Sequence, residues 1–332
     1  MPLLSRAVRL SCWGFHMEVK CDKCGRNRAV YFQRYTGLRL CKGCFNKYFI
    51  GKVKKTVMKY RMIRSGENIG LAVSGGKDSM VMLHVVSRMA SKIKDCSVTV
   101  LVVDEGIKGF RDESIRLVVE ACRSLDLPYV IGSFRKFFGV TMDEIVEMRL
   151  KISERRLRRR PCTYCGVLRR KVLNELALDE EVDKIAVASN LDDEIQAFLM
   201  NVTRGDYARI LRLKPVHEHT EGFVPRIKPF RECLEEEIAI FAFLNDIRYH
   251  YGDCPYLVEA YRRDIRNFLN YMDVKRPGIK FSILSSLDKL REMLEKIYVP
   301  ALRTCKICGT PSSSEICAAC KVLKELGLID SP

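Results

Sequence analysis

The chain is 332 residues long and 47% hydrophobic, enough for one substantial core with small appended modules, which excludes disorder throughout. No apolar run reaches the roughly 18 residues that span a bilayer, and no small-residue cleavage site follows the first residues, so neither a membrane-spanning nor a secreted protein is expected. The net charge of +17 favours a polyanion such as nucleic acid as partner, because neutralised phosphates release counterions, although a solvated basic surface is the alternative.

The N-terminal region carries most of this charge. Residues 1–66 hold 16 Lys and Arg against two acidic residues, Glu18 and Asp22. We expect Met17 to be the natural start and residues 1–16 to be a non-native or disordered extension.

Cysteine pairs then define a first module. Cys21, Cys24, Cys41 and Cys44 have the C-x-x-C…C-x-x-C spacing of a tetrahedral Zn²⁺ site. The residues between the pairs suit short strands, and a basic amphipathic helix is expected over 45–63. We expect this module to dock nucleic acid. Fifteen cysteines in a chain without a secretory signal are typical of metal ligands in a reducing compartment, so the protein is expected to be cytoplasmic.

Short apolar runs alternate with helical patterns in the middle of the chain. Strands are predicted over 69–73, 98–103, 129–133 and 184–188, and helices over 80–92, 114–125 and 192–202. This alternation predicts an α/β fold in which helices cover both faces of a parallel sheet.

The last third is expected to be mostly helical. Residues 205–228 look irregular, and helices are predicted over 232–245 and 257–272. A second zinc set follows, formed by Cys305, Cys308, Cys317 and Cys320. We expect this second module to order the C-terminus. The expected domains are an extension (1–16), a four-cysteine zinc finger (17–50), a catalytic domain (51–275), a helical connector (276–300) and a second four-cysteine zinc finger (301–325).

A glycine-rich loop lies between the first strand and the helix after it. Glycines let the backbone approach a phosphate, and the helix N-terminus and a lysine supply positive charge. A nearby carboxylate, Asp78, is a candidate Mg²⁺ ligand. The loop lacks the spacing of a Walker A motif. Its residues are Ser74, Gly75, Gly76, Lys77, Asp78 and Ser79.

A third cysteine pair, Cys162 and Cys165, follows a run of arginines formed by Arg155, Arg156, Arg158, Arg159 and Arg160. This positive charge predicts a depressed thiol pKa, which favours metal binding or sulfur chemistry. With the distant Cys254, the pair could hold an iron–sulfur cluster with one iron left open, or form a persulfide pair with a supporting thiol. A third zinc site or a buried structural pair are the alternatives.

Together these motifs closely resemble the tRNA 2-thiouridine synthetases of the TtuA/NcsA type, which are PP-loop ATP pyrophosphatases and include the eukaryotic cytosolic wobble-uridine thiolases. The resemblance covers nearly all of residues 17–325. It is carried by the N-terminal cysteines, Ser74–Ser79, Asp104–Ile107 with Gly109–Arg111, Pro161–Gly166, Ser189–Glu194, Arg226–Pro229, Cys254–Tyr256 and the C-terminal cysteine pairs.

The resemblance implies a PP-loop, Rossmann-type fold with zinc-binding modules at both ends. It implies that Cys162, Cys165 and Cys254 ligate a [4Fe–4S] cluster and are catalytic, with ATP and Mg²⁺ as further cofactors. The implied reaction adenylates the C2 oxygen of a tRNA uridine and replaces that oxygen with sulfur. The implied donor is a ubiquitin-like sulfur carrier or sulfide, and the implied assembly is a homodimer.

The resemblance also implies roles for residues around the loop. Asp78 and Asp192 are expected to act in catalysis, and Asp104, Asp193 and Arg169 to bind the nucleotide or its Mg²⁺. Asn190 or Asp192 as an ordinary helix N-cap is the alternative. Arg169 stands where some relatives have lysine, which puts acid–base chemistry there in doubt.

Three alternatives to wobble-uridine (uridine 34) thiolation remain. They are thiolation of uridine 54 in the T-loop by the same chemistry, a non-thiolating PP-loop amidating ligase, and a non-enzymatic zinc-ribbon RNA-binding protein.

Overall fold

The computed structural model describes residues 19–152, 159–218, 220–257, 260–297 and 303–330. The expected start at Met17, the extension before it, and Arg155, Arg156 and Arg158 lie outside these ranges. The chain divides into two compact units, one ending at Tyr48 and the other beginning at Phe49. Among the described residues, no helix is both long and apolar enough to cross a membrane.

The first unit is organised around its four cysteines. Strands β1 (Tyr31–Gln33) and β2 (Leu38–Leu40) pair antiparallel between the two cysteine pairs, as expected. Helix α1 (Lys42–Lys59) begins in this unit at the second pair, three residues earlier than predicted. It ends earlier too, because Arg61 takes a left-handed conformation with a φ of 49° that a helix cannot continue through.

The second unit is built on a five-stranded sheet in the order β5-β4-β3-β6-β7, with every neighbouring pair parallel. This confirms the predicted α/β class. The central strand β3 is buried along most of its length, as apolar runs in parallel sheets require. The strands are β3 (Asn68–Ala72), β4 (Ser97–Asp104), β5 (Tyr129–Ser133), β6 (Lys184–Ala186) and β7 (Arg226–Ile227).

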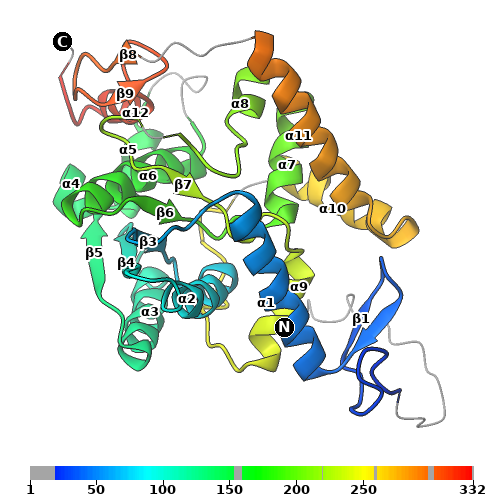
Figure 1. Cartoon of the computed structure of the whole chain (residues 1–332). Coiled ribbons are helices and arrows are strands. Elements are labelled where there is room, and N and C mark those ends of the chain that lie inside the picture. The colour runs from blue at the N-terminus through cyan, green and yellow to red at the C-terminus, as the bar shows by residue number, and fades with distance from the viewer. Residues whose placement is uncertain (1–18, 153–158, 219, 258–259, 298–302, 331–332) are drawn as a thin grey trace. The chain divides into compact units, whose positions relative to one another are not determined.

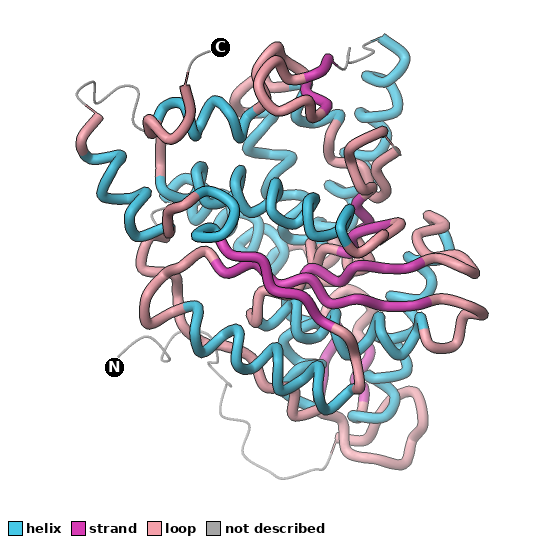
Figure 2. The backbone as a smooth tube through the Cα atoms, turned by 90° about the vertical axis from the view of Figure 1, so that its left-hand side faces the viewer, coloured by secondary structure: helices cyan, strands magenta, loops and turns pink. Residues whose placement is uncertain are grey.

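Helices cover both faces of this sheet (Figures 1 and 2). Figure 1 shows α2 (Lys77–Ala90) and α3 (Arg111–Leu125) on one side and α4 (Phe134–Phe138) and α6 (Pro161–Asp179) on the other. Helix α5 (Met142–Leu150) packs beside α6. The long helix α6 was not predicted, because Gly166 and its polar first turns obscure the apolar spacing that its second half shows.

A second group of helices packs around α7 (Leu191–Val202). Helices α10 and α11 both contact it, while α9 packs against α2. The segment predicted to be irregular contains α8 and the edge strand β7, which is too short to produce a periodic pattern. The remaining helices are α8 (Tyr207–Leu211), α9 (Glu235–Leu244), α10 (Ala260–Lys275) and α11 (Ile279–Ile297).

The C-terminal cysteine module consists of β8 (Arg303–Thr304), β9 (Pro311–Ser312) and α12 (Ala318–Glu325). Its buried residues belong to the same apolar cluster as α6. Cys317, Cys320 and Leu323 are buried together with Tyr164 and Leu168. The module therefore supports the helix that carries Cys162 and Cys165.

Candidate active site

The glycine-rich loop lies at the carboxyl end of β3, the strand from which the sheet extends in both directions. The chain builds β4 and β5 on one side of β3 and then returns to place β6 on the other. Such a reversal of strand order leaves a crevice where open α/β folds bind ligands. The loop after β3 and the segment Ser189–Glu194 after β6 both lead into this crevice.

The loop leaves a helix N-terminus free to receive an anion. Gly76 is the N-cap of α2 and offers no side-chain hydrogen bond to the first-turn amides. The Ser79 hydroxyl instead donates to the Gly76 carbonyl oxygen at 2.9 Å and accepts from the Ser74 amide at 3.2 Å, which holds the loop closed. The uncapped amides and Lys77 give the loop the chemistry of a phosphate site.

Gly75 is required for the shape of this loop. Its φ of 83° lies in the left-handed region, and a Cβ there would lie 2.6 Å from the Ser114 carbonyl oxygen. Both features exclude other residues, so this glycine serves the close backbone approach that the sequence predicts.

Asp78 lies beside this phosphate site with an unsatisfied carboxylate oxygen. Its Oδ1 is buried without a hydrogen-bond partner, although the Lys77 ammonium lies 3.7 Å away. Burial, together with the charges of Asp193 and Glu235, raises the pKa of Asp78 to about 6. An unpartnered carboxylate among other carboxylates has the donor chemistry that Mg²⁺ binding uses.

The segment after β6 reaches the loop through Asn190. This residue caps α7 by accepting from the Asp193 amide at 3.0 Å, and its side chain donates to Asp78 Oδ2 at 3.5 Å. Asp193, whose pKa is raised by burial, accepts from Arg262 at 2.9 Å. Both Asn190 and Asp193 thus belong to the crevice, and Asn190 is also the N-cap that the sequence offered as an alternative.

Asp192 points to a different set of partners. One carboxylate oxygen pairs with the ammonium of Lys280 on α11, and the other accepts from the Glu235 amide at 2.9 Å. The side chain is buried, and both oxygens are occupied. A catalytic role for Asp192 stays a prediction, and its contacts favour positioning of α9 and α11.

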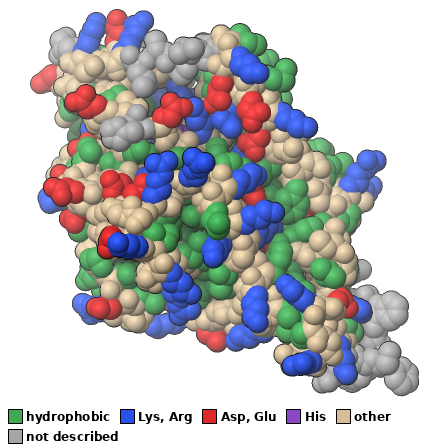
Figure 3. All heavy atoms as spheres, viewed as in Figure 1, with side chains coloured by type: hydrophobic (Ala, Val, Ile, Leu, Met, Phe, Trp, Pro, Cys, Tyr) green, Lys and Arg blue, Asp and Glu red, His purple; other side chains and the backbone are tan. Residues whose placement is uncertain are grey.

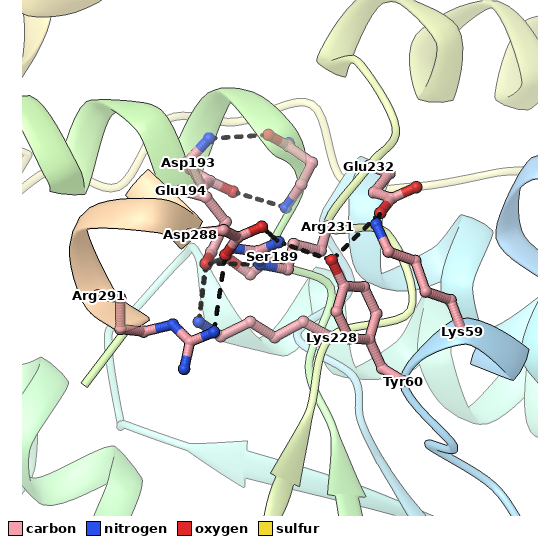
Figure 4. Close-up of polar contacts among 11 residues, drawn as sticks. Lys59, Tyr60, Ser189, Asp193, Glu194, Lys228, Arg231, Glu232, Asp288 and Arg291 are labelled. Atoms are coloured by element: carbon pink, nitrogen blue, oxygen red, sulfur yellow. Dashed lines mark hydrogen bonds and ion pairs between the residues drawn. The ribbon is translucent and has the colours of Figure 1, made fainter. Parts of the chain in front are cut away.

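A buried charge network holds α7 in place (Figure 4). Glu194 accepts from Ser189 at 2.9 Å and pairs with Lys228 at 2.8 Å. Arg231, which is fully buried, lies 3.6 Å from Glu194 and pairs with Asp288 of α11 at 2.6 Å. The network therefore ties the segment after β7 to both α7 and α11, and it gives Lys228 and Glu194 of the two motifs a structural role.

Helix α6 and a distant loop bring the three other cysteines together. Pro161 occupies the first turn of α6, so Cys162 and Cys165 lie at its N-terminal end. The Cys162 thiol donates to the Tyr256 carbonyl oxygen at 3.6 Å, which joins α6 to the loop that carries Cys254. Tyr256 is fixed in turn by a 2.7 Å hydrogen bond to Asp143 of α5.

The environment of this triad corrects one expectation. Burial, with help from Glu105 and the other two cysteines, raises the pKa of Cys165 to about 12 despite the opposing effect of Arg169. Burial also raises the pKa of Cys254. The predicted depression of the thiol pKa is therefore wrong for Cys165, because desolvation outweighs the positive charge.

The spacing of the triad differs from that of the terminal cysteine sets. Zn–S bonds of about 2.3 Å hold the sulfurs of a tetrahedral site roughly 3.8 Å apart. Among the described residues, the two four-cysteine sets have all their sulfurs within 4.8 Å of one another, and the triad does not form such a group.

Both four-cysteine sets fit a metal ion. The Cys24 and Cys41 sulfurs are 3.8 Å apart, and those of Cys308 and Cys317 are 3.6 Å apart. Burial disfavours the thiolate of Cys305, but backbone amides that include those of Cys317 and Cys308 lower its pKa to about 6. Donors already directed at sulfur are typical of thiolate metal sites.

Three side chains join the phosphate loop to the triad. Arg111 donates to the Ser74 carbonyl oxygen at 2.7 Å and pairs with Glu105 at 2.6 Å. Glu105, which is buried, also lies 3.5 Å from Arg169, the arginine beside Cys165. The two centres are therefore connected across the carboxyl end of β4.

Glu105 was not predicted as a site residue, whereas its neighbour Asp104 was. Asp104 accepts from the Gly106 amide at 2.8 Å and shapes the turn after β4. The position of Glu105 within the Asp104–Ile107 motif was the available signal, but strand alternation alone could not show which carboxylate lies between two arginines.

Comparisons with known proteins agree with this arrangement. A PP-loop domain matches residues 46–271, and the N-terminal LIM domain of the 2-thiouridine synthetase TtuA matches residues 20–46. A probable sulfurtransferase of Methanocaldococcus jannaschii is 38% identical, over 93% of this chain and 89% of its own length. Cytoplasmic tRNA 2-thiolation protein 1 of Xenopus laevis is 36% identical, with coverage of 93% and 89%.

A solved structure resembles the whole chain. The U34-tRNA thiolase NcsA from Methanococcus maripaludis, described with its [4Fe–4S] cluster, is 33% identical with a TM-score of 0.81. The match covers 94% of this chain and 97% of that one. The chain therefore belongs to the PP-loop tRNA 2-thiolation proteins of the TtuA/NcsA type.

Proposed function

We propose that this protein is an AMP-forming tRNA-uridine 2-sulfurtransferase that acts on the wobble uridine. The observation that carries the proposal is the pairing of two centres: a phosphate loop and a cysteine triad, joined by Arg111, Glu105 and Arg169. A reaction that activates an oxygen with ATP and then replaces it with sulfur needs both centres close together.

In the first step, the loop would bind the phosphates of ATP. The amides of α2 and the Lys77 ammonium would neutralise the departing pyrophosphate, while Asp78 and Asp193 would hold Mg²⁺. A bond forms between the uridine C2 oxygen and the α-phosphorus, and the bond to pyrophosphate breaks. In the second step a sulfur nucleophile bonds to C2 and AMP leaves with the oxygen.

Cys162, Cys165 and Cys254 are proposed to hold the [4Fe–4S] cluster, since the contact of Cys162 with Tyr256 brings the loop of Cys254 to α6 and the related NcsA is described with such a cluster. Bound there, the cluster would supply a site from which sulfur is delivered to the activated carbon. The three side chains contribute the ligands, and Arg169 offsets negative charge beside them. Zinc in both four-cysteine sets, a ubiquitin-like carrier or sulfide as donor, and a homodimer stay predictions from the family resemblance.

The exposed basic residues support tRNA as the substrate. Arg263 and Arg266 of α10 are exposed, as are Lys23 and Arg26 in the first cysteine module. Figure 3 shows Lys and Arg side chains across the middle of the viewed face, with hydrophobic atoms between them. Phosphate contacts of this kind position an RNA without reading its sequence. The relatives named as cytoplasmic favour the cytoplasm as the location.

The wobble position is favoured by the solved relative, which is named a U34-tRNA thiolase. Thiolation of uridine 54 by the same chemistry is the second candidate. An amidating ligase would not need the cysteine triad, and an RNA-binding protein without activity would not need a phosphate loop.

The test is reconstitution. The protein, loaded anaerobically with iron and sulfide, is incubated with ATP, Mg²⁺ and an unmodified tRNA transcript. The masses of the RNase fragments are then measured by mass spectrometry. A fragment from the anticodon that gains the mass difference of sulfur for oxygen supports the proposal. A gain in the T-loop fragment would show that the modified nucleotide is uridine 54 and not uridine 34. The absence of any gain would contradict thiolation.

Replacing Lys77 by alanine should slow AMP formation by about 100-fold, because one charged donor to the phosphates is removed where charge develops. The measurement is AMP release in the presence of tRNA. Lys92→Ala provides the control, since this lysine is exposed just beyond the other end of α2. Equal rates for the two variants would show that Lys77 does not act on the phosphates.

Replacing Cys162 by alanine should abolish 2-thiouridine while AMP formation persists, because the phosphate loop does not contain this residue. Iron content after reconstitution should fall as well. Cys96→Ala is the control, because Cys96 is a partly buried cysteine outside the cysteine groups of the described residues. Normal thiolation by the Cys162 variant would show that the triad is not required for the reaction.

A further inference from the structure

A short segment, Tyr249–Tyr251, precedes Cys254 in the chain and has no regular secondary structure. Its middle residue anchors it. The His250 amide donates to the Gly75 carbonyl oxygen at 2.9 Å, and the His250 ring packs edge-on against Phe110 with centroids 4.9 Å apart. His250 Nε2 also lies 3.3 Å from Glu113. The segment is thus fixed directly to the loop that we assign to ATP.

Gly252, the residue after this segment, shows that the chain turns back closely against the His250 ring. A Cβ at Gly252 would lie 2.5 Å from Cε1 of His250, so the chain turns closely around this ring. Two residues further on, Cys254 enters the triad. The segment is therefore held at the phosphate loop through His250, and the chain reaches Cys254 three residues after Tyr251.

The two tyrosines on either side of His250 form an aromatic pair. Their ring centroids are 4.3 Å apart with an interplanar angle of 35°. Tyr251 is 82% exposed, although large aromatic side chains are normally buried to a great extent. Tyr249 is half-buried and lies within electrostatic range of Asp78: burial, the adjacent Tyr251 and the Asp78 charge raise its pKa to about 12. The Tyr249 ring therefore stays neutral at physiological pH.

We propose that Tyr249 and Tyr251 form a stacking platform for an RNA base that flanks the uridine to be modified. This inference rests on the proposed function, because it assumes an RNA substrate. An exposed, neutral aromatic ring binds single-stranded bases through their π-faces, as in other RNA sites. The platform lies next to the phosphate loop, and the chain continues from it to Cys254 of the triad.

The exposure of the platform favours RNA over ATP as the source of the base. Sites for small molecules are concave and bury most of the ligand surface, whereas Tyr251 projects into solvent. A uridine in a loop must leave its neighbours' stack before C2 can enter a closed site, and this costs free energy. Stacking of the neighbouring base on Tyr251 would offset that cost and fix the strand.

The experiment measures binding, which does not require thiolation. An anticodon stem-loop RNA, with 2-aminopurine in place of a base next to the target uridine, is titrated with the metal-loaded protein, and its fluorescence reports stacking. Tyr251→Ala should weaken RNA binding about 10-fold, because this is the usual contribution of one stacked base to affinity. It should also remove the fluorescence change. Tyr251→Phe should preserve both, because it keeps the ring.

The control is Phe243→Ala, since Phe243 is an aromatic residue of nearly equal exposure, 81%, at the end of α9. Unchanged RNA binding by Tyr251→Ala, or an equal loss in both alanine variants, would overturn the platform. So would a raised KM for ATP with unchanged RNA affinity, which would assign the platform to adenine. Failure of the proposed function is distinguishable, because the wild-type protein would then bind the RNA without thiolating it.

Discussion

Replacing Cys320 by serine is expected to unfold the C-terminal cysteine module and to loosen helix α6 with it. Metal binding in small four-cysteine modules contributes roughly 10–16 kcal/mol to folding, and serine is a much poorer zinc ligand than a thiolate. The module's own apolar residues would compensate little, because those that are buried pack onto α6.

The effect should reach the active site through α12. Glu325, at the end of this helix, accepts hydrogen bonds from the Tyr164 hydroxyl and, at 2.7 Å, from Arg159. Tyr164 is fully buried and lies between Cys162 and Cys165 in sequence. Loss of the module would therefore expose the N-terminal end of α6 and displace the two cysteines.

The measurement combines zinc content, iron content after reconstitution and thermal unfolding. The Cys320 variant should lose zinc from one of the two four-cysteine sets and retain less iron than the wild type. Cys122→Ser serves as the control, because Cys122 is buried but belongs to neither of the cysteine groups found among the described residues. Full iron loading in the Cys320 variant would show that the module is independent of the triad.

Replacing Arg231 by methionine is expected to destabilise the second unit by about 3–5 kcal/mol, the usual cost of breaking a buried ion pair from one side. The arginine is fully buried, and its removal leaves part of the charge of Asp288 and of Glu194 uncompensated. It also removes the hydrogen bond at 3.2 Å to the Tyr60 hydroxyl (Figure 4).

Urea unfolding measures this effect as a shift in the transition midpoint. Arg209→Met is the matched control: its side chain is 59% exposed and pairs with Asp206 at 3.0 Å, so its loss should cost about 0–1 kcal/mol. The double variant Arg231→Met with Asp288→Leu should recover part of the stability, because it removes both charges. A midpoint for Arg231→Met equal to that of Arg209→Met would contradict a structural role for the network.

Local sequence was sufficient to predict those features whose residue pattern lies within one short segment. The strands β3, β4 and β5 were predicted within two residues, because continuous apolar runs bounded by turns are typical of parallel strands. The phosphate loop was equally clear, since two adjacent glycines between a strand and a helix let the backbone approach a phosphate. Both four-cysteine sets could be assigned because all four ligands of each lie in one short segment.

Tertiary structure decided what depends on residues distant in sequence. The sequence could not show that Asp192 pairs with Lys280 while Asp193 and Asn190 reach the crevice, because adjacent residues of a helix N-terminus face different partners. It also favoured a depressed pKa at Cys165, whereas burial against other elements raises it.

The sequence by itself determined the fold class, the phosphate loop, the family and the two terminal cysteine sets, because each depends on short-range patterns. Only the tertiary structure placed Glu105 between Arg111 and Arg169, packed the C-terminal module onto α6, and fixed the Tyr249–Tyr251 segment to the phosphate loop through His250. These contacts join segments separated by many residues. Their geometry is set by strand order and packing, which no local pattern records.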